Sequence, residues 1–511
     1  MRMPGPTEPI PAAAGPGPAG PGLDPHTRKM VLRDGIASRL MDTLTSGAFL
    51  AGLGLLTGAS NLELGILAAL PFLAQVAQVP ALALLLRLHD RRRFVVAVCA
   101  IARLILLAIA LLLLWDPARL TSGLLLALLG LSALLAVAAT AAWNWWMRDL
   151  LPPAILGRFF GRRLQWATFV ALGALLAAGW VLDRFVAAGR ATDGYALLFG
   201  LAALAGFVGL GYLARTPHTV PPPSPPAGRS LQQLGRVMRQ PPTRRLALAL
   251  GAMATAVTFA LPFAAVYMLR ALHFSYLAVT ALAALSQIAY IAGVRGWGHL
   301  SDHHGNRSVL LLSVGLLAAV QLGWAAAGWP AGWAMVAWLA ALHFLAGYAT
   351  GGVDLAGTNL LLRSAPLHGA PAHLAAVSLA RAFVAGLGTV AAGWLWDAVG
   401  AGALWSVGGW SLRGFQVLCL GGVALSLLAL VALARVPEPA ARPVLDVARA
   451  MRREVHQMSS IAGIRGLIHA VSYTVEFMAA PFAARRVRRA ASHAAAESTG
   501  APESSGPAKV P

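Results

Sequence analysis

Apolar runs of about twenty residues, almost free of charge, recur throughout this chain. A helix needs roughly twenty apolar residues to cross the ~30 Å hydrocarbon core of a bilayer. Of the 511 residues, 58% are hydrophobic and only 12% are charged, which excludes a water-soluble globular fold. The runs predict an all-α membrane protein with twelve transmembrane helices, near residues 36–58, 64–86, 94–115, 121–147, 164–186, 194–214, 246–268, 276–298, 308–328, 332–356, 374–398 and 413–435.

Arginine is concentrated in alternate connections between these runs, and the formal net charge is +21. Cytoplasmic loops of membrane proteins are enriched in Arg and Lys, whereas a nucleic-acid groove needs one continuous basic face. We therefore expect no nucleic-acid partner, both termini in the cytoplasm, and a multi-pass protein of the bacterial plasma (inner) membrane. The arginines on the expected cytoplasmic side are Arg87, Arg91, Arg92, Arg93, Arg158, Arg162, Arg163, Arg229, Arg236, Arg239, Arg244 and Arg245.

Two residue types that serve catalysis and metal binding are rare. Lys29 and Lys509, the only lysines, lie in the tails, so no P-loop or Schiff-base lysine is available to the membrane domain. Cys99 and Cys419 lie in separate apolar runs and have neither disulfide nor metal-ligand spacing. We expect no enzyme activity, no cofactor and no metal site.

The first six runs are repeated by the second six. Four features recur in the same order, at offsets of 212, 215, 214 and 220 residues. Six helices per copy give both copies the same orientation, which predicts two parallel six-helix repeats related by an axis along the membrane normal. The matched features are Asp90 with Asp302, Asn144–Arg148 with Asn359–Arg363, Ala178–Asp183 with Ala392–Asp397, and Leu213–Pro217 with Leu433–Pro437.

Composition divides the chain into five expected segments. They are a disordered N-terminal tail (1–32), an N-terminal six-helix half (33–216), a Pro-rich cytoplasmic linker (217–244), a C-terminal six-helix half (245–437) and a basic cytoplasmic tail (438–511). The last tail alternates apolar and basic residues at helical spacing over 440–490. This pattern indicates an amphipathic helix on the anionic inner leaflet or, as the alternative, a partner-binding segment.

The loop after the eighth run carries a specific motif, GHLSDHHGNRSVL from Gly298 to Leu310. It resembles the loop signature of the major facilitator superfamily, G-x-L-x-D-x-x-G-x-[RK]-x-x-L. Its fixed positions here include Gly298, Leu300, Asp302, Gly305 and Arg307. Gly305 permits the turn, and the carboxylate of Asp302 can accept hydrogen bonds from a helix N-terminus. The first-half copy keeps Asp90 but lacks both glycines.

The resemblance implies a secondary transporter whose two halves rock around a midplane site. It also implies that Asp302 latches the opposite half when the cytoplasmic side is closed. We expect a monomer that moves a small molecule, with the proton as coupling ion and efflux of an amphiphilic compound as the direction. Uptake of a metabolite and a non-transporting assembly or sensor protein on the same scaffold are the alternatives. The alternative for the motif is that its polar residues are only solvated loop residues without a latch role.

Few ionisable groups lie deep inside the apolar runs. Asp42 and Asp354 are the only carboxyls so placed, and His343 is the comparable imidazole. The resemblance puts them on cavity-lining helices, so they are candidates for proton coupling. The alternatives are a local pair of Asp42 with Arg39, one turn away, and hydrogen bonding of His343 to a neighbouring helix.

Other polar and aromatic groups complete the candidate list. The cavity candidates are Arg39, Asn144, Trp143, Tyr267 and Tyr348; an interfacial aromatic belt is the alternative for the tryptophans. Arg103, ten residues into the third run, is expected to pair with carbonyls or a carboxylate of a neighbouring helix.

Overall fold

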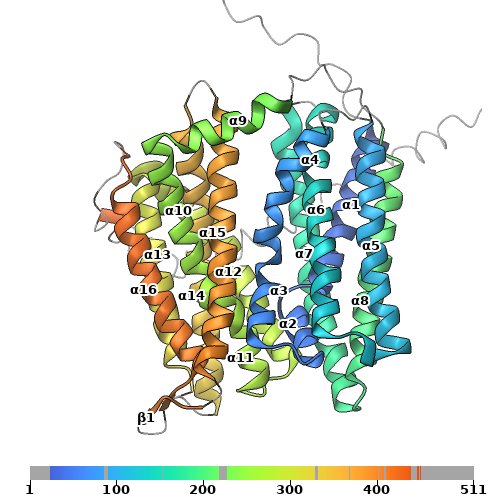
Figure 1. Cartoon of the computed structure of the whole chain (residues 1–511), viewed down its shortest axis with the longest axis vertical. Helices are drawn as coiled ribbons and strands as arrows, with labels where there is room; N and C mark the ends of the chain where they lie inside the picture. The colour runs from blue at the N-terminus through green and yellow to red at the C-terminus, as the bar shows by residue number, and fades with distance from the viewer. Residues whose placement is uncertain are drawn as a thin grey trace, which may run out of the picture. The chain divides into compact units, whose positions relative to one another are not determined.

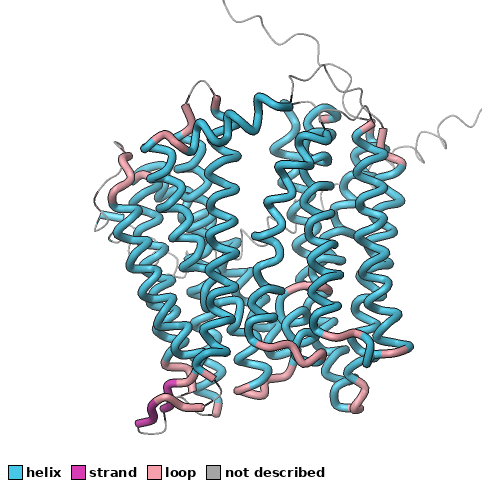
Figure 2. The backbone as a smooth tube through the Cα atoms, viewed as in Figure 1, coloured by secondary structure: helices cyan, strands magenta, loops and turns pink. Residues whose placement is uncertain are grey.

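The fold is described from a computed structural model. Figures 1 and 2 show that almost every element is a helix, which confirms the predicted all-α class. Residues 1–442 and 443–511 form two separate compact units, and every helix and strand named below lies in the first. The structure describes residues 24–85, 90–151, 153–217, 227–328, 332–366, 369–400, 402–407 and 410–438, together with 443, 446, 447 and 449.

Eight α-helices and two short 3-10 turns form the N-terminal half. They are α1 (Pro25–Leu44), α2 (Gly47–Leu56), α3 (Asn61–Leu73), η1 (Ala74–Ala77), α4 (Gln78–Leu85), α5 (Arg91–Trp115), η2 (Pro117–Arg119), α6 (Ser122–Leu150), α7 (Pro153–Ala187) and α8 (Ala191–Ala214).

The C-terminal half follows a linker helix, α9 (Ala227–Met238). It comprises α10 (Pro241–Ala260), η3 (Leu261–Phe263), α11 (Ala264–Arg270), α12 (Tyr276–His304), α13 (Asn306–Ala325), α14 (Trp333–Ser364), α15 (Ala370–Val399) and α16 (Gly414–Ala434). A two-stranded antiparallel hairpin, β1 (Trp405–Val407) and β2 (Trp410–Leu412), joins α15 to α16 and was not predicted.

The first predicted span is broken in two. Eleven stretches of the described chain are long and apolar enough to cross a membrane, and the predicted span 36–58 is not among them. Helix α1 ends at Leu44 and α2 starts at Gly47, whose positive φ of 58° is strained for any residue with a side chain. The twelfth crossing is therefore made by α1 and α2 together, with a break near Ser46.

Two helices occupy segments predicted to lack structure. Helix α1 begins inside the predicted N-terminal tail, because the Asp24 carboxylate accepts the Thr27 N–H and Pro25 occupies the first helical position. Helix α9 lies inside the predicted linker. Residues 218–226 of that linker lie outside the described residues, as does the predicted amphipathic tail except for 443, 446, 447 and 449.

The internal repeat is visible in matching contacts. In the first half, Arg92 at the start of α5 donates to the Thr216 carbonyl after α8, at 3.4 Å. In the second, Arg307 at the start of α13 donates to the Val436 carbonyl after α16, at 3.1 Å. In each half, a hydrogen bond thus joins the start of the third membrane crossing to the residues that follow the sixth.

The halves meet along two helix pairs, α3 with α15 and α7 with α12. We call the end at which α1 begins and α16 ends the terminal end, and the opposite end the far end (Figure 1). Helix α9 lies at the terminal end and packs on α15, α10 and α4, so it touches both halves.

Candidate functional site

At the far end, the last turns of α7 reach across to the other half. The two carboxylate oxygens of Asp183 accept the backbone N–H groups of Tyr276 and Leu277, at 2.7 and 2.9 Å. These are the first two residues of α12, whose N–H groups have no partner inside the helix. The N-cap Ser275 hydroxyl accepts the third N–H, from Ala278, at 3.2 Å.

The same arrangement occurs in the opposite direction. Asp397, near the end of α15, accepts the N–H groups of Asn61 and Leu62 at 3.0 and 2.8 Å. They begin α3 of the first half, and the Ser60 hydroxyl accepts the third N–H, from Glu63, at 3.1 Å. A carboxylate at a helix N-terminus makes charge-assisted bonds and favourable contact with the helix dipole. Each half therefore completes the cap of a helix in the other.

Two glycines allow this approach, each four residues before its aspartate. A Cβ on Gly179 would lie 2.4 Å from Thr280 Oγ1, and one on Gly393 would lie 2.4 Å from the Asn61 carbonyl oxygen. Both distances are too short for a real carbon atom. At Gly393 the obstructing atom is backbone, so a side chain there would separate the helices; at Gly179 it is the Thr280 hydroxyl, with backbone atoms of α12 at 3.1 Å.

Two further hydrogen bonds join the halves at the far end. The Tyr195 hydroxyl on α8 bonds to the Tyr276 hydroxyl at 2.9 Å, and Arg270 Nη1 donates to Asn61 Oδ1 at 2.9 Å. We call the set of Asp183, Asp397 and these contacts the far-end latch. The two aspartates were predicted from sequence to be repeat partners, but no role was predicted for them.

The signature loop lies at the terminal end and works within its own half. Asp302 is 71% exposed, and its carboxylate lies 4.0 Å from Arg363 Nη2 at the end of α14. The start of α13 is capped by Glu438, which accepts the N–H groups of Asn306 and Arg307 at 3.1 and 2.6 Å. Gly305 makes the predicted turn with a φ of 87°.

The other motif positions have structural surroundings. Leu300 is buried, and Gly298 lies on α12. Asp90 accepts the Arg93 N–H at 2.9 Å and so caps α5 of its own half. Residues 86–89 of the first-half copy lie outside the described part of the chain.

Arg39 and Asp42 are exposed on α1, one turn apart. Among the described residues, neither side chain has a hydrogen-bond or ion-pair partner. Successive residues of an α-helix are rotated by about 100° around its axis, so Asp42 lies on roughly the opposite face of α1 from Leu40. On α14, Asp354 is also exposed, and its carboxylate accepts a hydrogen bond from the Tyr290 hydroxyl at 3.3 Å. Asp42 and Asp354 thus place an exposed carboxyl well inside a membrane crossing of each half, away from the ends of that crossing.

Two of the candidates are held by their own half. The His343 Nδ1 lies 2.8 Å from the Leu339 carbonyl, and its ring packs edge-on against Trp324. Tyr267 is buried; its ring stacks on Phe415, and its hydroxyl donates to the Ala327 carbonyl at 3.2 Å. Tyr267, a cavity candidate from the sequence, is therefore packed among core residues of the far end.

Of the three remaining candidates, Trp143 and Tyr348 pack on aromatic rings of their own half. Trp143 is half-buried, packs edge-on against Phe160 and carries the Arg163 guanidinium over its ring, 4.9 Å from the centroid. The ring centroids of Tyr348 and Trp297 lie 5.0 Å apart, and the Trp297 indole N–H donates a hydrogen bond to the Tyr348 carbonyl. Asn144 alone of these three is exposed.

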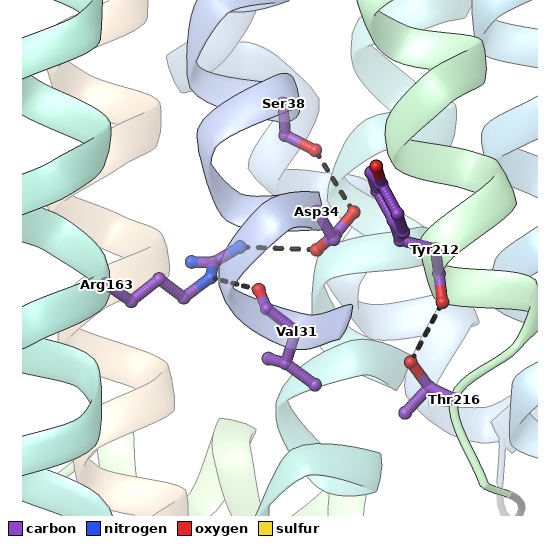
Figure 3. A network of polar contacts seen from close by, with 6 residues as sticks. All are labelled: Val31, Asp34, Ser38, Arg163, Tyr212 and Thr216. Carbon is purple, nitrogen blue, oxygen red and sulfur yellow. Dashed lines mark hydrogen bonds and ion pairs between the residues drawn. The ribbon is translucent and has the colours of Figure 1, made fainter. Parts of the chain in front are cut away.

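A buried polar network around Asp34 stabilises the first half (Figure 3). Arg163 of α7 donates to the Val31 carbonyl at 3.2 Å and to the Asp34 carboxylate at 3.4 Å, and Ser38 donates to the same carboxylate. Asp34 itself is only 3% exposed.

Arg103 behaves as its position predicts. It is buried within α5, and its Nε donates to the Gly206 carbonyl of α8 at 2.7 Å. The bond to a neighbouring carbonyl confirms the structural role expected for it. Because a buried guanidinium needs such partners, α5 and α8 are fixed to each other within the first half.

Comparison with known proteins shows similarity in structure but not in sequence. No protein-family model matches the sequence, and no curated protein matches it significantly. A bacterial homologue of the human lysosomal transporter Spinster, solved inward-facing and unoccupied, gives a TM-score of 0.60 at 15% identity, covering 81% of this chain and 97% of that one.

Other solved transporters are similar to the same degree. The nucleoside transporter NupG gives a TM-score of 0.58 at 14% identity, covering 80% of this chain and 98% of that one. A bacterial homologue of the iron transporter ferroportin, inward-facing, gives 0.59 at 16% identity, covering 80% and 98%. This chain has the major facilitator fold, as the signature loop and the repeat predicted.

Proposed function

We propose that this protein is a secondary transporter that moves a small molecule across the plasma membrane by alternating access. The observation that carries the proposal is the far-end latch: Asp183 and Asp397 complete helix caps across the interface at one end of the molecule. Hydrogen bonds to the first turn of a helix can break without unfolding that helix, because water can replace the lost acceptor. Such contacts suit an interface that opens and closes.

In the proposed cycle, the far-end latch holds one state and the signature loop holds the other. Among the described residues, the ion-pair partner of Asp302 is Arg363 of its own half, and Asp302 would engage the first half when the terminal end closes. With the arginine-rich terminal end in the cytoplasm, the latched far end faces outside and the state is inward-facing. Two of the similar transporters, the Spinster and ferroportin homologues, are also inward-facing.

Proton-coupled efflux of an amphiphilic compound by a monomer in the bacterial inner membrane is the form of transport we propose. Asp42 supports the coupling, because it is an exposed carboxyl within a membrane-spanning segment and has no hydrogen-bond or ion-pair partner among the described side chains. Asp354, hydrogen-bonded to Tyr290, is the second candidate. We base efflux on the signature loop, which is common among exporters. Uptake of a metabolite, the alternative, would use the same alternating access.

Transport is tested with purified protein in proteoliposomes under an imposed pH gradient. The vesicles are incubated with a mixture of nucleosides, amino acids, sugars and lipophilic cations, and their contents are measured by mass spectrometry. Protein-free vesicles and vesicles containing the Asp183→Lys/Asp397→Lys variant are the controls. Accumulation or depletion of one class by the wild type alone supports transport. A folded wild type that moves none of these classes, whether or not a gradient is present, favours the non-transporting assembly or sensor protein.

A further inference from the structure

A long groove lies on the outer face of the first half. Its floor is α1, and its walls are α7 and α8, which are joined by a turn at the far end. It has a volume of about 790 Å³, within the ~300–1,000 Å³ range of sites that hold small molecules. The floor includes Ile36, Leu40 and Leu44, and the wall from α7 is made of small residues such as Ala174 and Ala177.

The groove is open to lipid. Its α8 wall consists of large apolar side chains that are 40–59% exposed, which are Leu197, Leu201, Leu204 and Val208. In the second half, the span Pro241–Arg270, which begins with α10, the equivalent of α1, is the most enclosed of the candidate spans.

The groove is polar at one end only. Arg33 and Tyr212 lie there, at the terminal end, and the Arg33 guanidinium sits over the Tyr212 ring, 5.5 Å from its centroid. Arg33 is exposed and has no carboxylate partner among the described residues; the neighbouring Asp34 is bonded to Arg163. From Arg33 to Leu44 the floor runs about 16 Å at ~1.5 Å per residue, roughly half the ~30 Å bilayer core.

We propose that this groove binds an anionic phospholipid of the leaflet at the terminal end. One acyl chain lies along α1 between the two walls, and the phosphate group contacts Arg33. An apolar trough one leaflet long, with Arg33 as the cation among its lining residues, matches that shape and charge. The cation–π contact with Tyr212 holds the guanidinium at the mouth while leaving its N–H groups to bind phosphate. This site is independent of the proposed transport cycle.

The test uses delipidated full-length protein in detergent. The protein is incubated with equal amounts of phosphatidylglycerol and phosphatidylcholine of identical chains, and bound lipid is counted by native mass spectrometry. Arg33→Gln removes the charge, and Ala177→Phe fills the exposed wall, with Ala174→Leu as a second filling variant. Arg245→Gln is the matched control, because Arg245 is also exposed at the terminal end but lies at the start of α10.

The wild type and Arg245→Gln should retain phosphatidylglycerol in preference to phosphatidylcholine. Arg33→Gln should reduce that preference about five-fold, the effect of one arginine at an anionic lipid surface. The filling variants should lose both lipids together, since they block the chain. Equal retention of both lipids by the wild type would overturn the proposal. So would equal losses in Arg33→Gln and Arg245→Gln, or wild-type binding in both filling variants.

Discussion

Gly179 and Gly393 occupy equivalent positions in the two halves, 214 residues apart, and each lies four residues before the aspartate that caps a helix of the opposite half. The glycine sets how closely the helices approach, and the aspartate supplies the polar contact. Because the arrangement occurs once in each direction, the two interfaces at the far end close by the same chemistry. The internal repeat therefore has a mechanical consequence as well as an evolutionary one.

Removing the capping charges should open the far end. In Asp183→Asn with Asp397→Asn, each helix loses charge-assisted bonds that contribute about 1.5–3 kcal/mol. The population closed at the far end should fall about ten-fold or more. Electron paramagnetic resonance distances between spin labels at Arg119→Cys and Trp333→Cys, in a background lacking Cys99 and Cys419, measure this opening.

Asp116→Asn is the matched control for the far-end distances. Asp116 is also an aspartate of the far end, but it pairs with Arg119 of its own half at 2.7 Å; for this control the spin label moves from Arg119 to Ser122. It should leave the distance distribution unchanged. If the double variant, like the control, left the distribution of its own label pair unchanged, the far-end latch would have no role in holding this state.

A side chain at Gly393 should also open the far end, by steric overlap and not by loss of charge. In Gly393→Val, the new atoms meet the Asn61 carbonyl, and such overpacking costs about 1–3 kcal/mol. The far end should therefore shift towards open by about ten-fold. Gly173→Val is the control, because nothing lies within 4 Å of a Cβ there. If a far-end cysteine were labelled equally in Gly393→Val and Gly173→Val, close approach of the helices at Gly393 would not be what keeps the far end closed.

Asp302 and Glu438 should separate function from stability. Asp302→Asn should leave the thermal unfolding midpoint almost unchanged, because its exposed ion pair contributes at most about 1 kcal/mol. It should nevertheless impair closure of the terminal end and so reduce transport. Glu438→Gln weakens the cap of α13 and should lower the midpoint by several degrees in a thermal-shift assay. A strong midpoint loss in Asp302→Asn, with none in Glu438→Gln, would reverse these assignments.

Most of the fold could be predicted from the sequence because the bilayer restricts spanning structures to apolar helices of known length. The break near Ser46 could not, since Leu44 and Gly47 sit in one apolar run. The far-end latch was missed for a different reason. The partners of Asp183 and Asp397 are backbone N–H groups, which almost every residue carries, so only the fold shows which ones they reach. Ser60 and Ser275, 215 residues apart, were the available signal, as N-cap residues at equivalent helix starts.

Which way the candidate cavity residues face could not be predicted from the sequence for a related reason. Tyr267 and Asn144 both sit on helices that the resemblance assigns to the cavity, yet Tyr267 is buried and Asn144 is exposed. A helix has several faces, and the sequence of a nearly uniform apolar helix has little periodicity to tell them apart. Packing of aromatic neighbours such as Phe415 decides the face, and those neighbours are distant in sequence.

The proposed orientation predicts which end is reached from outside the cell. A membrane-impermeant maleimide should label Trp333→Cys in intact cells, since that side chain is 84% exposed at the far end. It should reach Arg239→Cys and Ser224→Cys only after the cells are permeabilised. Labelling of Arg239→Cys or Ser224→Cys in intact cells would invert the topology and, with it, the identification of this state as inward-facing.

Proton coupling is predicted to depend on Asp42. If protons drive transport, a carboxyl must take up a proton on one side and release it on the other as the halves rock. Asp42 is exposed within the first crossing and unpaired among the described residues, whereas Asp354 is hydrogen-bonded to Tyr290 and His343 is packed against Trp324. A carboxyl without a fixed partner is the group best suited to exchange its proton with water.

Asp42→Asn should therefore abolish accumulation driven by a pH gradient while leaving downhill exchange of substrate measurable in proteoliposomes. Substrate binding and rocking do not require the proton, so exchange tests that the variant is folded and active. Asp354→Asn should reduce driven accumulation less, and His343→Gln should leave it close to the wild type because its imidazole is held by the Leu339 carbonyl. If Asp42→Asn combined with Asp354→Asn still accumulated substrate against its gradient, protons would not be the coupling ion.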